Sequence, residues 1–190
     1  FAIIGFLVAL LTLRARRAGS WTLRETRWGP LLHAELALGA GNSGKLVALL
    51  REEARRRTRV SGCETILVDA PPGIGCPVHA AMTGATRLVL VAEPTPSGLH
   101  DLDRILDLAG HFRLPVAVVV NKADLDEEGT QALEWLAATR ELLVLGRIPF
   151  DAEVPRVLAR GGTPLEVPAV ARAIRACWEA LQPLLAAGEA

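Results

Sequence analysis

The chain has 190 residues, of which 51% are apolar, and its 21 basic and 21 acidic side chains give a formal net charge of zero. This balance excludes a disordered charged tail and a nucleic-acid binder that works through bulk positive charge, so no nucleic-acid partner is expected. The chain has only three scattered cysteines. They exclude a disulfide framework and favour free thiols in a cytoplasmic compartment.

The chain begins with a nearly unbroken apolar run over residues 1–13, which ends at a group of arginines. The run is shorter than the roughly 20 residues of a membrane-spanning helix, so no transmembrane segment is predicted. It also lacks the basic start of a signal peptide. Because the first residue is Phe1 rather than Met, we expect the chain to be part of a longer protein, and residues 1–18 remain an unassigned segment.

Apolar strands alternate with amphipathic helices from residue 31 onward. Strands are predicted over residues 31–38, 65–68, 87–92, 116–120 and 142–148. Helices are predicted over residues 43–59, 79–84, 98–112, 127–139, 154–160 and 167–185. This alternation predicts an α/β fold, a doubly wound and mostly parallel sheet flanked by helices.

Polar, glycine or proline residues follow four of the predicted strands, at residues 69–73, 93–98, 121–124 and 149–151. Ligands bind beyond the carboxyl ends of the strands in sheets of this kind. The coincidence predicts a ligand site built from these four segments.

Asp69 ends the predicted strand at residues 65–68, and the turn Pro71-Pro72-Gly73 follows it. A carboxylate at a strand end can hold Mg²⁺ through water. Gly73 can present its backbone N–H to a phosphate without a side chain in the way. A simple turn or a helix cap is the alternative interpretation of Asp69, and the adjoining turn favours the metal site.

The segment Asn121-Lys122-Ala123-Asp124 follows the most apolar strand and is a candidate for base recognition. An Asn amide can donate to and accept from a purine edge, and a Lys stem can cover the ring. The same letters match the guanine-reading pattern of GTPases, and a plain polar turn is a further alternative.

Residues 39–46 have the spacing of a phosphate-binding loop, with Lys45 in the lysine position. Leu46 stands where a Ser or Thr would ligate Mg²⁺. The alternative is a glycine-rich entry into a helix, with Asn42 or Ser43 as the cap. Lys45 is a candidate contact for a phosphate or for the switch segment.

Residues 66–78 resemble the switch II segment of the MinD/ParA-like P-loop ATPase superfamily, and more narrowly its branch with an inserted 4Fe–4S ferredoxin domain. Supporting stretches occur in the same order at residues 25–31, 41–47, 93–102, 119–125 and 148–151. The resemblance covers about residues 19–167.

The resemblance implies a dimerising, Mg²⁺-dependent ATPase. It makes Asp69 the Walker-B acid that holds Mg²⁺ through water and places Gly73 in the same catalytic segment. It places Asn121 against adenine, with Lys122 and Asp124 in the same nucleotide-binding loop. A second loop, formed by Pro149, Phe150 and Asp151, would then lie beside the base.

Two parts of the family pattern do not occur in this sequence. It contains no Lys-Gly-Gly-type phosphate loop and no ferredoxin insert with runs of four cysteines, so ligands for 4Fe–4S clusters are absent. We therefore interpret residues 19–190 as the C-terminal part of a MinD-like ATPase domain and residues 1–18 as a remnant of the missing insert. A homodimer and an iron–sulfur or redox partner are expected of the intact protein.

Two other functions stay open on the sequence alone. The first is a GTPase-like switch that reads guanine with Asn121, Lys122 and Asp124. The second is a non-catalytic scaffold or dimerisation domain, because the loss of a phosphate loop removes most phosphate contacts.

Overall fold

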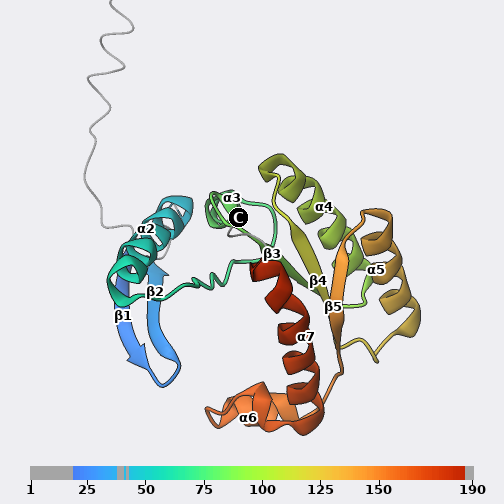
Figure 1. Cartoon of the computed structure of the whole chain (residues 1–190). Coiled ribbons are helices and arrows are strands. Elements are labelled where there is room, and N and C mark those ends of the chain that lie inside the picture. The colour runs from blue at the N-terminus through green and yellow to red at the C-terminus, as the bar shows by residue number, and fades with distance from the viewer. Residues whose placement is uncertain (1–18, 38–40, 42, 187–190) are drawn as a thin grey trace, which may run out of the picture. The chain divides into compact units, whose positions relative to one another are not determined.

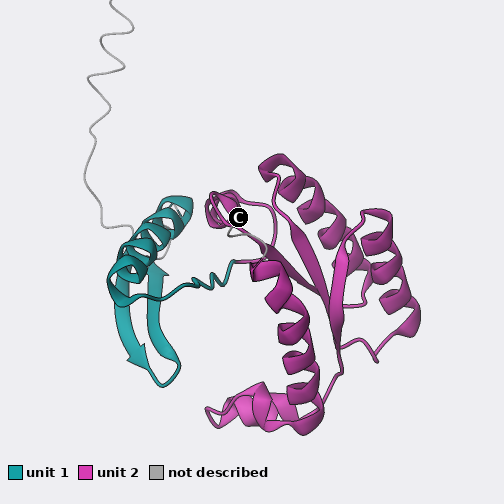
Figure 2. Cartoon of the chain, in the orientation of Figure 1, with its two compact units in different colours: residues 1–70 teal, residues 71–190 magenta. Residues whose placement is uncertain are grey.

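The structure, a computed structural model, describes residues 19–37, 41 and 43–186. It divides into two compact units, residues 1–70 and residues 71–190 (Figure 2). The segment that the sequence left unassigned, residues 1–18, lies outside the described residues.

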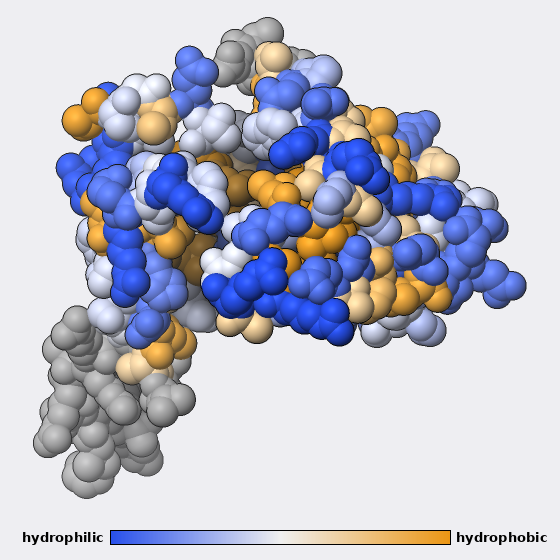
Figure 3. Space-filling view, turned by 90° about the horizontal axis from the view of Figure 1, so that it is seen from below, coloured by the Kyte–Doolittle hydropathy of each residue, from blue (hydrophilic) through white to orange (hydrophobic). Residues whose placement is uncertain are grey.

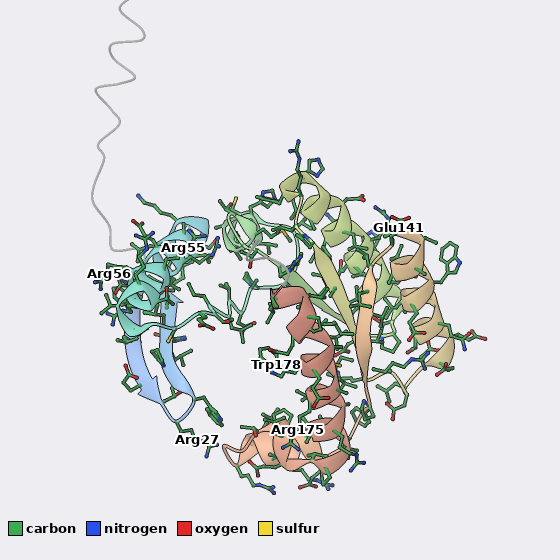
Figure 4. All side chains as sticks on the ribbon, viewed as in Figure 1. Arg27, Arg55, Arg56, Glu141, Arg175 and Trp178 are labelled. Carbon is green, nitrogen blue, oxygen red and sulfur yellow. The ribbon has the colours of Figure 1, made fainter. Side chains whose placement is uncertain are left out.

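The first unit contains a β-hairpin and one helix. Strands β1 (Gly19–Thr26) and β2 (Gly29–Leu36) pair antiparallel, and helix α2 (Ser43–Ser61) contacts β2. The hairpin turn carries Trp28, which is 69% exposed, with the guanidinium of Arg27 4.0 Å from the centre of its ring (Arg27 is labelled in Figure 4). The sequence predicted β2 and α2 but missed β1, so the antiparallel pairing was not expected.

The strand predicted at residues 65–68 is absent, and this prediction was wrong. Residues 63–70 are described, form neither helix nor strand and are exposed throughout. Leu67 is 92% exposed, and Ile66 and Val68 are each exposed by more than a third. A strand is stabilised by pairing with a neighbour, and the hairpin and the sheet of the second unit do not include this segment.

The second unit contains a three-stranded parallel sheet in the order β3-β4-β5, formed by β3 (Leu88–Ala92), β4 (Val116–Asn121) and β5 (Leu143–Ile148) (Figure 1). Its helices are α3 (Cys76–Met82), α4 (Pro96–Phe112), α5 (Glu127–Thr139), α6 (Glu153–Ala159) and α7 (Pro168–Ala186), with a 3-10 turn at Pro164–Glu166. The strands and α-helices agree with the sequence predictions to within three residues at each end, whereas the 3-10 turn was not predicted.

Helices cover both faces of this sheet, as the sequence predicted. On one face α4 and α5 pack against Val118 and Val120, which are fully buried. On the other face α7 packs against Ala117 and Val119. The continuous apolar sequence of β4 thus reflects burial on both sides. The apolar β3 differs, because Val91 on its second face is 64% exposed.

Helix α7 approaches the sheet closely at a glycine. The β4–β5 pairing shifts register between Val118 and Val119, opposite Gly146, whose φ is 158°. A methyl group on Gly146 would lie 2.8 Å from Sγ of Cys177 on α7. Glycine therefore permits both the irregular backbone and the contact with the helix.

Apolar side chains also remain on the surface of both units, where Figure 3 shows them interspersed with hydrophilic ones. Trp178 on α7 is 50% exposed, and Figure 4 labels it on that helix. Within the described ranges, no helix combines the length and the apolar character needed to cross a membrane.

Candidate functional site

Three of the four polar segments predicted to form a ligand site meet at one edge of the sheet. Strands β3, β4 and β5 are parallel neighbours, so the segments after them begin at the same edge. These segments begin at Glu93, Asn121 and Pro149, and Asn121 is also the last residue of β4. Open α/β sheets bind ligands at this edge.

A carboxylate joins the first two of these loops. Glu93 Oε1 lies 2.7 Å from Nζ of Lys122 and accepts a hydrogen bond from Nδ2 of Asn121 over 3.5 Å. The side chains of Lys122 and Glu93 are 38% and 43% exposed. The pair is therefore fixed in position but remains accessible to a ligand.

The loop after β4 has an unusual backbone that the surrounding structure holds in place. Lys122 has a φ of 55°, in the left-handed region that few non-glycine residues adopt. The Ala123 N–H donates to the Ile148 carbonyl over 3.0 Å, and the hydroxyl of Thr130 donates to the Ala123 carbonyl over 2.8 Å. Such backbone strain is concentrated at binding and switch sites.

A second carboxylate joins the loop after β4 to the loop after β5. Asp124 Oδ1 accepts a hydrogen bond from the Phe150 N–H over 2.6 Å. Asp151 Oδ1 accepts from the Glu153 N–H over 2.8 Å, where α6 begins. The structure thus brings together the two segments that the sequence assigned to nucleotide binding.

Two glycines allow the loop after β3 to pack against the starts of α4 and α5. A Cβ on Gly98 would collide with the carbonyl oxygen of Glu93, and a Cβ on Gly129 would lie 2.8 Å from the carbonyl oxygen of Pro94. The Gly98 N–H donates to Oγ1 of Thr95, the residue that caps α4, over 3.0 Å. These contacts fix the backbone that carries Glu93.

An arginine of β5 fastens α5 beside this site. Arg147 donates to both carboxylate oxygens of Glu134, over 2.6 and 2.7 Å, and a third nitrogen lies 3.2 Å from Oε1 of Glu127. The hydrogen bonds from Arg147 lower the pKa of Glu134, and those to Glu134 raise the pKa of Arg147. The pair holds α5, whose first residues follow the Asn121–Asp124 loop, against the sheet.

The remaining predicted site residues lie outside this group of loops. Asp69 is exposed within residues 63–70, and Lys45 is exposed in the first turn of α2. Both belong to the first unit, whereas the three loops belong to the second. Gly73, at the start of the second unit, has a φ of 90° and no heavy atom within 4 Å of an added Cβ. A shared role for these residues stays a prediction.

The glycine-rich segment before α2 has a different context from a phosphate-binding loop. Such a loop connects a strand of a parallel sheet to a helix. Here β2 precedes it, and β2 pairs antiparallel with β1 in a two-stranded sheet. Residues 38–40 and 42 of this segment lie outside the described residues, whereas Lys45 itself is described.

The donor groups of the chain suit Mg²⁺ better than an iron–sulfur cluster. The described residues contain no cluster of three His, Cys, Asp or Glu side chains that could hold a metal. Mg²⁺ needs only one or two protein carboxylates when phosphates and water complete its coordination. The exposed carboxylate of Asp69 meets this requirement. A 4Fe–4S cluster needs four thiolates, and the chain has only three cysteines. One of them, Cys177, is buried and packs against Gly146.

The contacts of Glu93 with Lys122 and Asn121 were not predicted from the sequence. The sequence marked residues 93–98 as a polar segment after a strand, but it assigned no side chain there to the site. An acidic residue at the same sheet edge as the Asn-Lys pair was the available signal, because parallel neighbouring strands bring such residues together.

No protein-family model matches the chain. It is 27% identical over 130 residues to an uncharacterised protein of Methanocaldococcus jannaschii. The aligned region covers 68% of this chain and 42% of that protein. It is 30% identical over 150 residues to the chloroplastic septum site-determining protein MinD homologue of Arabidopsis thaliana. This aligned region covers 73% of this chain and 45% of that protein. The chain therefore spans less than half the length of these relatives.

Solved structures show a similar fold. A chain of the MinC:MinD cell division protein complex of Aquifex aeolicus superimposes with a TM-score of 0.61 at 22% identity, over 86% of this chain and 66% of that one. The cell division ATPase MinD of Pyrococcus furiosus gives 0.61 at 19% identity, over 75% and 59%. The chain has a P-loop NTPase-like fold. The predicted α/β class, with a parallel sheet flanked by helices, is thereby confirmed.

Proposed function

We propose that the chain is the C-terminal part of a MinD/ParA-like ATPase and that it binds the base of ATP at the carboxyl ends of β3, β4 and β5. The main support is that the segments beginning at Glu93, Asn121 and Pro149 are joined by hydrogen bonds at the edge where such sheets bind ligands. The similarity in sequence to a MinD homologue and in fold to MinD structures supports the same proposal.

The proposed roles follow from the chemistry of each side chain. The Asn121 amide meets the base edge, and the Lys122 stem lies along the ring. Asp124 orders the loop of Pro149, Phe150 and Asp151 through the Phe150 N–H. This loop then lies beside the base and keeps water from it.

The phosphate end is assigned to residues that precede the sheet. Asp69 holds Mg²⁺ through water, Gly73 offers its N–H to a phosphate, and Lys45 contacts a phosphate or the switch. Bound Mg²⁺ supplies charge neutralisation at the β- and γ-phosphates. Hydrolysis then changes the conformation of residues 71–76, as switch segments do when phosphate contacts are lost.

The intact protein is proposed to be a homodimer whose nucleotide state controls partner binding. The Aquifex MinD structure is a complex with MinC, which illustrates such a partner for that protein. The narrower assignment to the branch with a ferredoxin insert, and a redox partner, rests on the resemblance in sequence at residues 66–78 and its supporting stretches.

A GTPase-like switch is the second candidate, because Asn121, Lys122 and Asp124 match the guanine-reading pattern. In that pattern the Asp carboxylate accepts hydrogen bonds from guanine. Here one oxygen of Asp124 already accepts from the Phe150 N–H. A carboxylate has further lone pairs that can accept from guanine, so the preference for adenine in our proposal rests on the similarity to the MinD ATPases.

Competition between nucleotides tests the proposal. ATP and GTP are titrated in the presence of Mg²⁺ against a fluorescent ADP analogue bound to the protein. We expect ATP to displace the analogue at lower concentration than GTP. Preference for GTP would support the second candidate, and failure of the protein to bind any nucleotide would support a scaffold.

Turnover tests the assignment of Asp69. In the intact protein, Asp69→Asn is expected to lower ATP hydrolysis by orders of magnitude with little effect on folding, because the carboxylate is exposed. Unchanged hydrolysis by the variant would remove Asp69 from the metal site.

A further inference from the structure

The carboxylate of Glu93 contacts Asn121 and Lys122, the two residues proposed to meet the base. Its Oε1 lies 2.7 Å from Nζ of Lys122 and 3.5 Å from Nδ2 of Asn121. We propose that Glu93 is a positioning residue that sets the orientation of the Asn121 amide and so selects a 6-amino purine over a 6-oxo purine. This inference rests on the nucleotide site proposed above.

The two ends of an amide side chain differ in what they can hydrogen-bond. The two ends of the Asn121 side chain are an NH₂ group that donates and a carbonyl oxygen that accepts. An ionised carboxylate can only accept, so Glu93 can be met by the NH₂ end and not by the carbonyl. With Nδ2 turned to Glu93, the carbonyl oxygen of Asn121 is the end left to meet a ligand.

The surroundings hold Glu93 in the position that this role requires. The ion pair with Lys122 keeps the carboxylate beside the loop after β4. The close approach of Gly98 to the Glu93 carbonyl fixes the backbone that carries the side chain. Lys122 itself has a φ of 55°, and its neighbour Ala123 is hydrogen-bonded to Ile148 and Thr130. The Glu93 side chain is 43% exposed, so a base can reach the loops it joins.

An acceptor at this position discriminates between purines by the group on carbon 6. Adenine carries an amino group there, which donates to the Asn121 carbonyl. Hypoxanthine and guanine carry a carbonyl oxygen, and two acceptors that face each other leave both without a hydrogen bond. A site built to hydrogen-bond one group rejects the analogue that lacks it.

The probes are ATP and inosine triphosphate, which share the same ribose and triphosphate. Their bases differ in the group on carbon 6 and in the hydrogen that hypoxanthine carries on N1. Each is titrated into the ¹⁵N-labelled protein, and dissociation constants are read from chemical shifts in ¹H–¹⁵N spectra, which also report the fold of each variant. We expect the wild-type protein to bind ATP at least about tenfold more tightly than inosine triphosphate.

The deciding variant is Glu93→Gln. A glutamine amide can accept from or donate to Asn121, so the Asn121 amide is free to turn either way. The preference for ATP is expected to fall to within about threefold. Glu141→Gln is the matched control, because it removes the same charge between α5 and β5, at the end of β5 away from the proposed site. This variant is expected to keep the wild-type preference for ATP.

A double variant separates positioning from general damage. In the Asn121→Ala background the preference is already lost, so adding Glu93→Gln is expected to change it no further. If the protein binds ATP and Glu93→Gln retains the full preference over inosine triphosphate, the role of Glu93 is overturned while the nucleotide site stands. If no variant and no wild-type protein binds ATP, the proposed site and this inference both fail.

Discussion

The hydroxyl of Thr130 donates a hydrogen bond to the backbone carbonyl of Ala123 across 2.8 Å, and its side chain is fully buried. Thr130 lies in the first turns of α5, whereas Ala123 lies in the loop after β4. The bond therefore anchors the loop of the candidate base site to the helix that follows it. A buried carbonyl that loses such a partner is costly, because no water replaces it.

Replacing Thr130 by Val is expected to destabilise the protein by about 1–3 kcal/mol, since the shape is kept but the Ala123 carbonyl loses its donor. Urea unfolding followed by circular dichroism measures this loss. Thr130→Ser is the matched control, because it keeps the hydroxyl and removes only a methyl group. Equal stability of Thr130→Val and the wild-type protein would show that the bond contributes nothing.

Two glycines of α4 are expected to respond in opposite directions to the same substitution. A Cβ on Gly98 would collide with the Glu93 carbonyl, so Gly98→Ala should destabilise the protein and shift the loop after β3. Gly110 has nothing within 4 Å of an added Cβ, so Gly110→Ala should stabilise the helix by up to about 1 kcal/mol. Melting temperatures of the two variants test this, and equal shifts would contradict the role of Gly98.

The helices and strands of the second unit were predictable because each has a periodic apolar pattern of its own. The pattern at residues 65–68 is just as apolar, yet those residues form no strand. Apolar sequence indicates the tendency to form a strand, but pairing requires a neighbour with free backbone groups. For β1 the error was the opposite one, because a strand formed where none was predicted. Arg24 and Glu25 interrupt the apolar pattern of β1, yet β2 pairs with it along its full length.

The candidate site was predictable only in part. The segments after β4 and β5 were identified from their residue types, and the structure joins them through Asp124 and the Phe150 N–H. The contact of Glu93 with Lys122 depends on strand order. The loop that contains Lys122 is held at Ala123, which accepts a hydrogen bond from Thr130 of α5 and donates one to the Ile148 carbonyl of β5. Neither relation is encoded in a short stretch of sequence.

The three cysteines are expected to differ in reactivity. Cys63 and Cys76 are exposed, whereas Cys177 is 7% exposed, and burial raises the pKa of its thiol. The thiolate is the reactive form, so Cys177 is protected by both access and ionisation. With a thiol reagent such as Ellman's reagent, two thiols should react in the native protein and the third only after denaturation. Cys177→Ala should remove the slow thiol alone, and rapid reaction of all three would contradict the packing of α7.

The ion pair between Glu134 and Arg147 predicts a pH dependence of stability. Hydrogen bonds from Arg147 lower the pKa of Glu134 in the folded state. A lowered folded-state pKa stabilises the protein fully above the unfolded-state value of about 4.3, and the contribution is lost as the pH falls through the folded-state pKa. Because the pair is partly exposed, its contribution at pH 7 is expected to be about 0.5–1 kcal/mol.

Unfolding in urea at pH 7 and at pH 3 tests this dependence. Glu134→Gln removes the charge at both values, so the variant is expected to be less stable than the wild-type protein at pH 7 and closer to it at pH 3. Glu179→Gln makes the same change at an exposed position of α7 and should give a smaller difference at pH 7. A constant gap between Glu134→Gln and the wild-type protein across this range would mean that Glu134 stabilises α5 through packing rather than through its charge.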